Sequence, residues 1–351
     1  MKIIDTHLHI WNLEELSLPW LSGEGPVLNR TYTLEDYKNA LGADPEYEVE
    51  AAVYVEVDSA RTDKDRENAF IIGCCADGAD LFRGAILSGY LNEDGFKEYM
   101  GRYLDVPGVK GVRQVLHVPE ALPGTCLGEA FLENVRWLGE NGLVYEGCVR
   151  NGELGDLCEM ARSCPGTTIV LDHMGIVDPD IISRENPSEE EMAYRTAWIE
   201  NIKRLAALPN VVCKVSGLNP AGAWTDETLR PAVDICLDAF GGDRVMYASN
   251  FPVCNVATGM APWIGALDRI TRERGEDFQK KLWLKKKFVV ETNWCMTLDR
   301  IDESFWPEII ANPAQIQEWT EMYAIDEVEG DLTTVGWTNP PTVEFLRQNQ
   351  N

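Results

Sequence analysis

Short apolar segments alternate with longer amphipathic ones along most of the chain. Strands are predicted over 2–10, 48–58, 81–91, 109–117, 143–149, 167–175, 211–218 and 244–250. Helices are predicted from Thr33 onward and over 61–76, 94–104, 127–142, 152–164, 188–208 and 225–240. Eight strands with helices between them predict a (β/α)8 TIM barrel of the α/β class.

The strand at 48–58 illustrates the expected packing of this barrel. Val53, Val55 and Val57 share one face, and Tyr54, Glu56 and Asp58 share the other. We expect the valines to pack under helices and the polar residues near the strand end to face the mouth. Glu56 is therefore a candidate site residue.

The C-terminal part differs in composition from the barrel. Residues 255–290 are expected to supply closing helices, so the barrel is predicted to occupy 1–298. The acidic stretch 299–351 carries Trp306, Trp319 and Trp337, and disordered tails seldom carry so many tryptophans. We predict an extension that packs on the barrel or on a partner subunit, and hence a possible homo-oligomer.

Charge and cysteine usage narrow the class of protein. Against 31 basic residues there are 58 acidic ones, and the net charge of -27 argues against nucleic acid or an anionic membrane as partner. The expected binding partner is therefore a small-molecule substrate. Ten scattered cysteines suit buried thiols in a reducing compartment, and no segment approaches the ~18 apolar residues of a membrane span. We expect a soluble, cytoplasmic protein.

The first strand ends in a His-x-His pair, and the chain has only four histidines. His7 and His9 are two residues apart on a strand, so their imidazoles lie on one face. They are either a metal or substrate site or a pair satisfied by hydrogen bonds. Trp11 follows closely enough to line the mouth, and the irregular segment 11–33 is long enough to form a lid or a packed loop there.

Other polar residues fall where predicted strands end, which is the catalytic face of such barrels. They are Arg113, His117, Glu146, Asp172, His173, Lys214, Ser216 and Asn250. Together they predict a pocket with imidazole, carboxylate, amide and guanidinium groups.

Several of these residues have two interpretations. Arg113 either pairs with Glu146 inside the barrel or grips a carboxylate or hydroxyl of the substrate. Lys214 is expected to pair with a carboxylate, whether or not it contacts substrate, and His117 is structural or substrate-binding. Asp172 acts in catalysis, orients His173 or caps the following loop.

Four segments resemble the signature segments of the amidohydrolase superfamily. They are Asp5-Thr6-His7-Leu8-His9, Leu171-Asp172-His173-Met174-Gly175, Lys214-Val215-Ser216-Gly217-Leu218 and Ser249-Asn250-Phe251-Pro252-Val253. More narrowly they resemble the branch that contains sugar lactonases and dicarboxylate lactone hydrolases. The resemblance spans about residues 2–290 and leaves out the tail.

The resemblance implies roles for individual residues. His7 and His9 would bind a divalent metal, or hydrogen-bond the substrate in a metal-independent enzyme. His173 would polarise the scissile carbonyl or join the metal site. One zinc or manganese ion is implied, with His7, His9 and His173 as ligands.

Asn250 departs from the pattern, because the matching family position is the aspartate that activates water. An amide cannot take a proton near neutral pH. Another carboxylate could be the base, with Glu56, Glu146 and Asp172 as candidates. Alternatively the asparagine was engineered to trap a substrate, or catalysis has been lost.

Together the residues and the resemblance predict a hydrolase that opens a lactone of a sugar acid or related carboxylate, an enzyme of carbohydrate metabolism. Activated water would attack the carbonyl, His173 and the His-x-His pair would stabilise the oxyanion, and Arg113, Glu56, His117, Lys214 and Trp11 would contact substrate. The alternatives are a metal-dependent decarboxylase of the same superfamily and an inactive ligand-binding relative.

Overall fold

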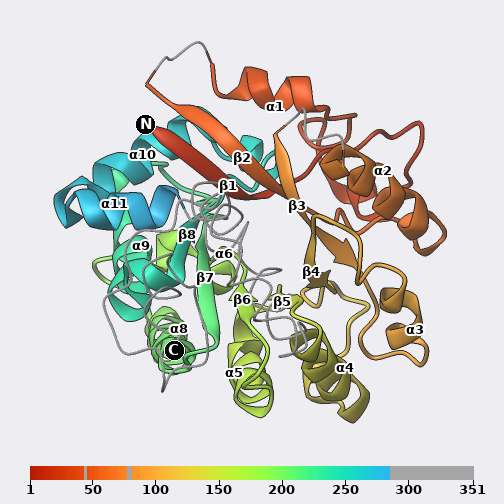
Figure 1. The fold of residues 1–351 in the computed structure, drawn as a ribbon. Helices are drawn as coiled ribbons and strands as arrows, with labels where there is room; N and C mark the ends of the chain where they lie inside the picture. The colour runs from red at the N-terminus through yellow and green to blue at the C-terminus, as the bar shows by residue number, and fades with distance from the viewer. Residues whose placement is uncertain (43–45, 77–80, 285–351) are drawn as a thin grey trace, which may run out of the picture. The chain divides into compact units, whose positions relative to one another are not determined.

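Eight parallel strands form one sheet whose spatial order follows the chain (Figure 1). The computed structural model describes residues 1–42, 46–76 and 81–284. The strands are β1 (Lys2–Leu8), β2 (Glu48–Val55), β3 (Phe82–Ser88), β4 (Val109–Arg113), β5 (Val144–Gly147), β6 (Ile169–Leu171), β7 (Val211–Val215) and β8 (Val245–Tyr247). Each strand pairs in parallel with the next one along the chain, as the predicted barrel requires.

The first and last strands close the sheet on itself. Leu8 forms a parallel bridge with Phe251, just beyond the end of β8. The backbone N–H of Asn250 donates to the carbonyl of His7 at 2.9 Å, and that of His9 donates to the carbonyl of Phe251 at 2.8 Å. This seam confirms the predicted barrel and places the His-x-His pair beside the end of β8.

Helices surround the barrel between successive strands (Figure 1). The α-helices are α1 (Leu34–Ala40), α2 (Lys64–Ala76), α3 (Phe96–Gly101), α4 (Glu129–Glu140), α5 (Leu154–Ser163), α6 (His173–Ile176), α7 (Pro179–Ser183), α8 (Glu189–Ala206), α9 (Asp226–Phe240), α10 (Met260–Thr271) and α11 (Glu276–Trp283). The 3-10 helices are η1 (Pro19–Gly23), η2 (Arg61–Asp63), η3 (Thr125–Leu127), η4 (Asn151–Glu153), η5 (Gly242–Arg244), η6 (Val253–Val256) and η7 (Arg272–Arg274).

Capping boxes start two of these helices. The Thr33 side chain accepts from the backbone N–H of Asp36, and the Asp36 carboxylate accepts from that of Thr33. Ser188 and Glu191 make the same reciprocal pair at the start of α8. Each box satisfies two N–H groups at a helix start, so the helix predicted from Thr33 is confirmed.

The apolar residues of the strands divide between two clusters. A large one lies between strands and helices, and a small one is formed by strand residues and fills the barrel interior. Val53 and Val55 belong to the inner cluster, while Tyr54 lies outside against Phe82. The prediction that the valines of β2 pack outward under the helices was therefore wrong. Glu56 follows the end of β2 at Val55, but its side chain is 1% exposed and does not line the mouth.

Several strands are shorter than their apolar patterns predict. Because β4 ends at Arg113, β6 at Leu171 and β8 at Tyr247, none of the three residues His117, His173 and Asn250 lies in a strand: His117 and Asn250 are in loops, and His173 is the first residue of α6. Backbone pairing stops there although apolar residues continue, which puts these side chains at the mouth. None of the described helices is long and apolar enough to cross a membrane. The predicted extension at 299–351 lies outside the described residues.

Candidate active site

A cavity of about 490 Å³ opens at the carboxyl ends of the strands. Its wall includes the predicted residues His9, Trp11, Arg113, His117, His173 and Asn250, together with Trp20, Glu24, Leu28, Asp58 and Asn219. Trp11 is 2% exposed, its indole N–H donates to the carbonyl of Arg30 at 2.6 Å, and its backbone pairs with Tyr32. The segment 11–33 is therefore a packed loop that walls one side of the cavity.

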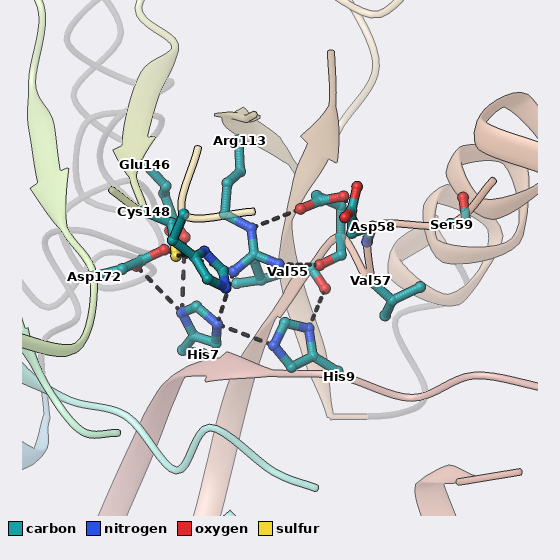
Figure 2. Close-up of polar contacts among 12 residues, drawn as sticks. His7, His9, Val55, Val57, Asp58, Ser59, Arg113, Glu146, Cys148 and Asp172 are labelled. Atoms are coloured by element: carbon teal, nitrogen blue, oxygen red, sulfur yellow. Dashed lines mark hydrogen bonds and ion pairs between the residues drawn. The ribbon is translucent and has the colours of Figure 1, made fainter. Parts of the chain in front are cut away.

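His7 and His9 lie side by side, as the strand spacing predicts (Figure 2). His9 lines the cavity, and His7 is fully buried beneath it. Their Nε2 atoms are 3.1 Å apart. His9 Nδ1 is 2.7 Å from the carbonyl of Val55, and since a carbonyl only accepts, Nδ1 carries the proton. The Nε2 lone pair of His9 is consequently directed at His7 and available to a ligand.

His173 approaches the same point from the end of β6. Its ring centroid is 4.6 Å from that of His7, and its Nδ1 is 2.8 Å from the Ser216 hydroxyl. Gly217 makes the approach possible, because a Cβ there would lie 2.6 Å from the Cβ of His173. Ser216 and Gly217 thus fix the ring with Nε2 free.

Asp172 faces His7 rather than His173. Its Oδ1 is 3.4 Å from Nδ1 of His7 and 3.6 Å from the Lys214 ammonium, which also binds Glu146. Asp172 makes no capping bond to the helix that follows. The expected roles of orienting His173 or capping the loop were therefore wrong, while the expected pairing of Lys214 with a carboxylate is confirmed.

Arg113 pairs with Glu56 and not with Glu146. Its Nε donates to Oε1 of Glu56 at 2.7 Å, and Nη2 donates to the backbone carbonyl of Glu56. The remaining nitrogen, Nη1, is 3.4 Å from His7 Nε2 and 3.6 Å from Asp172 Oδ2. The guanidinium is thus used mainly to hold the base of the cavity together.

The three imidazoles at the base are neutral. Burial lowers the pKa of His9 to about 3, and the nearby Arg113 charge adds to the effect. Burial also lowers the pKa of His173 to about 4, and the pKa of His7 falls well below its usual value through burial and the Lys214 charge. Neutral imidazole is the form that binds a metal ion.

The buried carboxylates titrate in opposite directions. Burial raises the pKa of Glu146 to about 8, an effect that Lys214 opposes and Asp172 reinforces. Burial alone would raise the pKa of Glu56 as well, but Arg113 and Lys64 outweigh it and hold that pKa at about 2. Lys214 and His7 likewise hold the pKa of Asp172 well below its usual range against burial.

The donor set fits a single divalent cation. His7, Asp172 and His173 each offer a ligand atom within 4.8 Å of the others, and His9 Nε2 lies beside His7. Both carboxylate oxygens of Asp172 are buried without a hydrogen-bond partner among the described residues. Imidazole with one carboxylate is a usual set for zinc, with Zn–N distances of about 2.0–2.1 Å. These residues could therefore hold the metal that the histidine pattern predicts, with Asp172 as an added ligand.

Besides His7 and Ser216, four predicted residues with charged side chains lie beneath the cavity wall instead of in it. Glu56, Glu146, Asp172 and Lys214 are each no more than 2% exposed. Glu56 and Lys214 were expected to contact substrate, but Glu56 is paired with Arg113, and Lys214 contacts Glu146 and Asp172.

His117 stands apart from the imidazole cluster. It lines the cavity, but its Nδ1 is 3.3 Å from the thiol of Cys148. Two nearby residues were not predicted as site members: Asp58 in the cavity wall and Lys64, whose ammonium is 3.4 Å from both Glu56 and Asp58. The polar face of 54, 56 and 58 was the available signal for Asp58.

A closed α/β barrel with an imidazole and carboxylate cluster at the carboxyl ends of its strands belongs to the class of barrel enzymes that place their active site at this face. A family model described as Amidohydrolase matches residues 4–284. The chain belongs to the amidohydrolase family, as its signature segments indicate, and the family points to a hydrolase.

Related proteins cover most of the barrel. Protein y4mH of Sinorhizobium fredii is 29% identical over 287 residues, 77% of this chain and 92% of the relative. An L-fucono-1,5-lactonase of Burkholderia multivorans is 27% identical over 280 residues, 77% of this chain and 89% of the relative. A crystal structure of a Burkholderia multivorans amidohydrolase with bound zinc is 26% identical, with a TM-score of 0.68 over 81% of this chain and 96% of that one.

Proposed function

We propose that this protein hydrolyses an uncharged lactone of a sugar acid. The observation that carries the proposal is the charge of the cavity wall. Among the described residues of the wall the acids are Glu24 and Asp58, and the one strong cation is Arg113. Arg113 is committed to Glu56, so a bound carboxylate would find no free cationic side chain in the wall. An uncharged polyhydroxy lactone suits this wall better than a dicarboxylate.

Two further observations support a sugar substrate. The wall carries the indole rings of Trp11 and Trp20, whose centroids are 5.9 Å apart, and because Trp11 is 2% exposed, the half-buried Trp20 is the ring that can meet the apolar face of a sugar. Asn219 and Asn250 add amide groups that can bond hydroxyls. The similarity to an L-fucono-1,5-lactonase supports the same substrate class.

We further propose that His7, His9, His173 and Asp172 hold one divalent ion, with zinc the first candidate because a 26% identical structure binds it. When bound, the ion would supply Lewis-acid polarisation of the lactone carbonyl. The protein's own contribution is to keep the imidazoles neutral and fixed, His9 through Val55 and His173 through Ser216. Asn250 lies in the wall, where its amide can hold the attacking water.

The proposal is tested by comparing substrates of different charge. We expect kcat/KM for neutral sugar lactones such as L-fucono-1,5-lactone to exceed that for a dicarboxylate lactone at least 100-fold. Acid release is followed by pH indicator in zinc- or manganese-loaded protein, and carbon dioxide is measured with aromatic acids as substrates. Release of carbon dioxide without lactone hydrolysis would favour the decarboxylase. Binding without turnover of any substrate would favour the inactive relative.

A second expectation concerns Arg113→Lys. Lysine keeps the charge but cannot bond both Oε1 and the backbone carbonyl of Glu56, so the cavity base should loosen. Lactone kcat/KM should fall more than tenfold, about 1.4 kcal/mol or more in transition-state binding. Arg269→Lys is the control, because Arg269 makes an exposed bidentate pair with Asp226 on the outer surface. Equal kinetics in the two variants would remove Arg113 from the site.

A further inference from the structure

None of the residues discussed so far has been assigned as the catalytic base of this site. Asn250 occupies the position at the end of β8, and its amide cannot accept a proton from water near neutral pH. The expected substitutes, Glu56, Glu146 and Asp172, have side chains that are 1%, 3% and 0% exposed. Each is also bound by a fixed cation, Arg113 or Lys214. A water in the cavity therefore cannot reach them.

Two described carboxylates do reach the cavity, Asp58 and Glu24. The Asp58 side chain is 37% exposed, and one of its oxygens, Oδ1, is 3.4 Å from the Lys64 ammonium. Its other oxygen, Oδ2, has no hydrogen-bond partner within the described ranges. Glu24 is exposed on the loop after η1 and has no ion pair within those ranges. Asp58 is thus the carboxylate that is held in place and open to the cavity.

The backbone around Asp58 is built to present this side chain. Asp58 has φ 49°, in the left-handed region, and its N–H donates to Oε2 of Glu56 at 2.8 Å. His173 and Asn250, also in the cavity wall, have φ of 53° and 54°. Such conformations cost of order 1–3 kcal/mol each and cluster at active sites. Ile176, with φ 51°, is a fourth such residue in the wall, and this concentration of left-handed backbone marks the cavity as the functional site.

We propose that Asp58 is the general base of this enzyme, a catalytic residue that takes the role of the carboxylate missing at position 250. The proposal rests on the proposed lactone hydrolysis. Asp58 accepts one proton from the attacking water as the new C–O bond forms at the lactone carbonyl. The ring C–O bond then breaks, its electron pair goes to the ring oxygen, and that oxygen takes the proton back from Asp58. Lactone and water thereby give the open hydroxy acid, and Asp58 is regenerated.

The charges around Asp58 suit a group that exchanges protons. Burial and the neighbouring Glu56 carboxylate raise the pKa of Asp58, while Lys64 and Arg113 oppose the rise. Lys64 is itself 5% exposed and lies between Glu56 and Asp58, so it can stabilise whichever of them is charged. Lys64 is a positioning residue in this arrangement.

Asp58→Asn is the decisive variant, because asparagine has the same shape and tolerates a left-handed backbone. We expect kcat on the sugar lactone to fall about 10²–10⁴-fold, the usual contribution of a positioned base, with KM and bound metal nearly unchanged. Glu24→Gln removes the other carboxylate of the wall, and its kcat should fall less than tenfold. A larger loss in Glu24→Gln, or an active Asp58→Asn, would overturn the assignment.

The double variant Asp58→Asn/Asn250→Asp tests whether a carboxylate at position 250 can replace the base lost at position 58. A new carboxylate at the end of β8 should recover at least tenfold in kcat if the loss reflects a missing base. In the unmodified protein the same change should leave kcat flat or lower, because a second carboxylate in the same cavity wall would raise the pKa of one of the two and favour its protonated form. A double variant no better than Asp58→Asn would overturn the proposal. Absence of lactone hydrolysis by the unmodified protein would overturn the function and, with it, this role.

Discussion

His9→Ala should abolish binding of the divalent ion proposed for this site and lower lactone kcat/KM more than 100-fold. His9 Nδ1 is bonded to the carbonyl of Val55, so the ring is fixed with Nε2 3.1 Å from His7 Nε2. Removing it takes away one neutral ligand and the group that orients its neighbour. Loss of a ligand or of its supporting partner usually lowers metal affinity or activity at least 10–100-fold. Metal content is measured by elemental analysis after dialysis.

His117→Ala is the matched control for this experiment. His117 lies in the same cavity, but its Nδ1 faces the Cys148 thiol, and it is outside the imidazole cluster. It should retain one metal per chain. If His9→Ala also retains the metal, or if both variants lose it equally, the ligand assignment fails. Both variants should show the circular dichroism of the parent, because the barrel is held by strand pairing and two apolar clusters.

Lys214→Met should destabilise the metal-free protein by about 3–5 kcal/mol, the usual effect of leaving a buried charge without its partner. Lys214 is 1% exposed, binds Glu146 and lies 3.6 Å from Asp172. Methionine matches its length and fills its place, so the loss would reflect charge rather than a cavity. The free energy of unfolding is measured by urea denaturation with chelator present.

A second change separates charge from packing. Asp172→Asn in the Lys214→Met background removes the buried carboxylate that is held in its charged form, and part of the stability should return. Lys2→Met is the control, since Lys2 makes an exposed ion pair with Glu50 and its loss should hardly alter stability. A single Lys214→Met variant as stable as the parent would mean that the buried ammonium contributes nothing to the fold.

The fold was predictable because apolar and amphipathic segments alternate clearly along the chain, even where the exact ends of each strand and helix cannot be placed. The base of the site was predictable for a similar reason: His7 and His9 must share a face, and His173 falls at a strand end. The partner of Arg113 was not, because β2 and β4 are not adjacent, and Glu56 reaches Arg113 only through the turn after Val55. Sequence spacing does not encode that turn.

The sequence pattern also could not predict how deeply each polar side chain is buried. Glu56 and Asp58 are two residues apart on the same predicted face, yet one is buried under a cation and the other opens to the cavity. The difference arises from the left-handed backbone at Asp58. A strand pattern assumes extended geometry throughout, so it ranked the buried carboxylate above the accessible one.

The seam between β1 and β8 has a consequence for how this enzyme is made. His7 and His9 are translated about 240 residues before Asn250 and Phe251, whose backbone groups complete the hydrogen bonds of their strand. Until β8 emerges from the ribosome, β1 has an unpaired edge, and such edges invite pairing with other chains. A nascent chain truncated before β8 should therefore bind chaperones and lack activity, and completion of the active site should coincide with closure of the barrel.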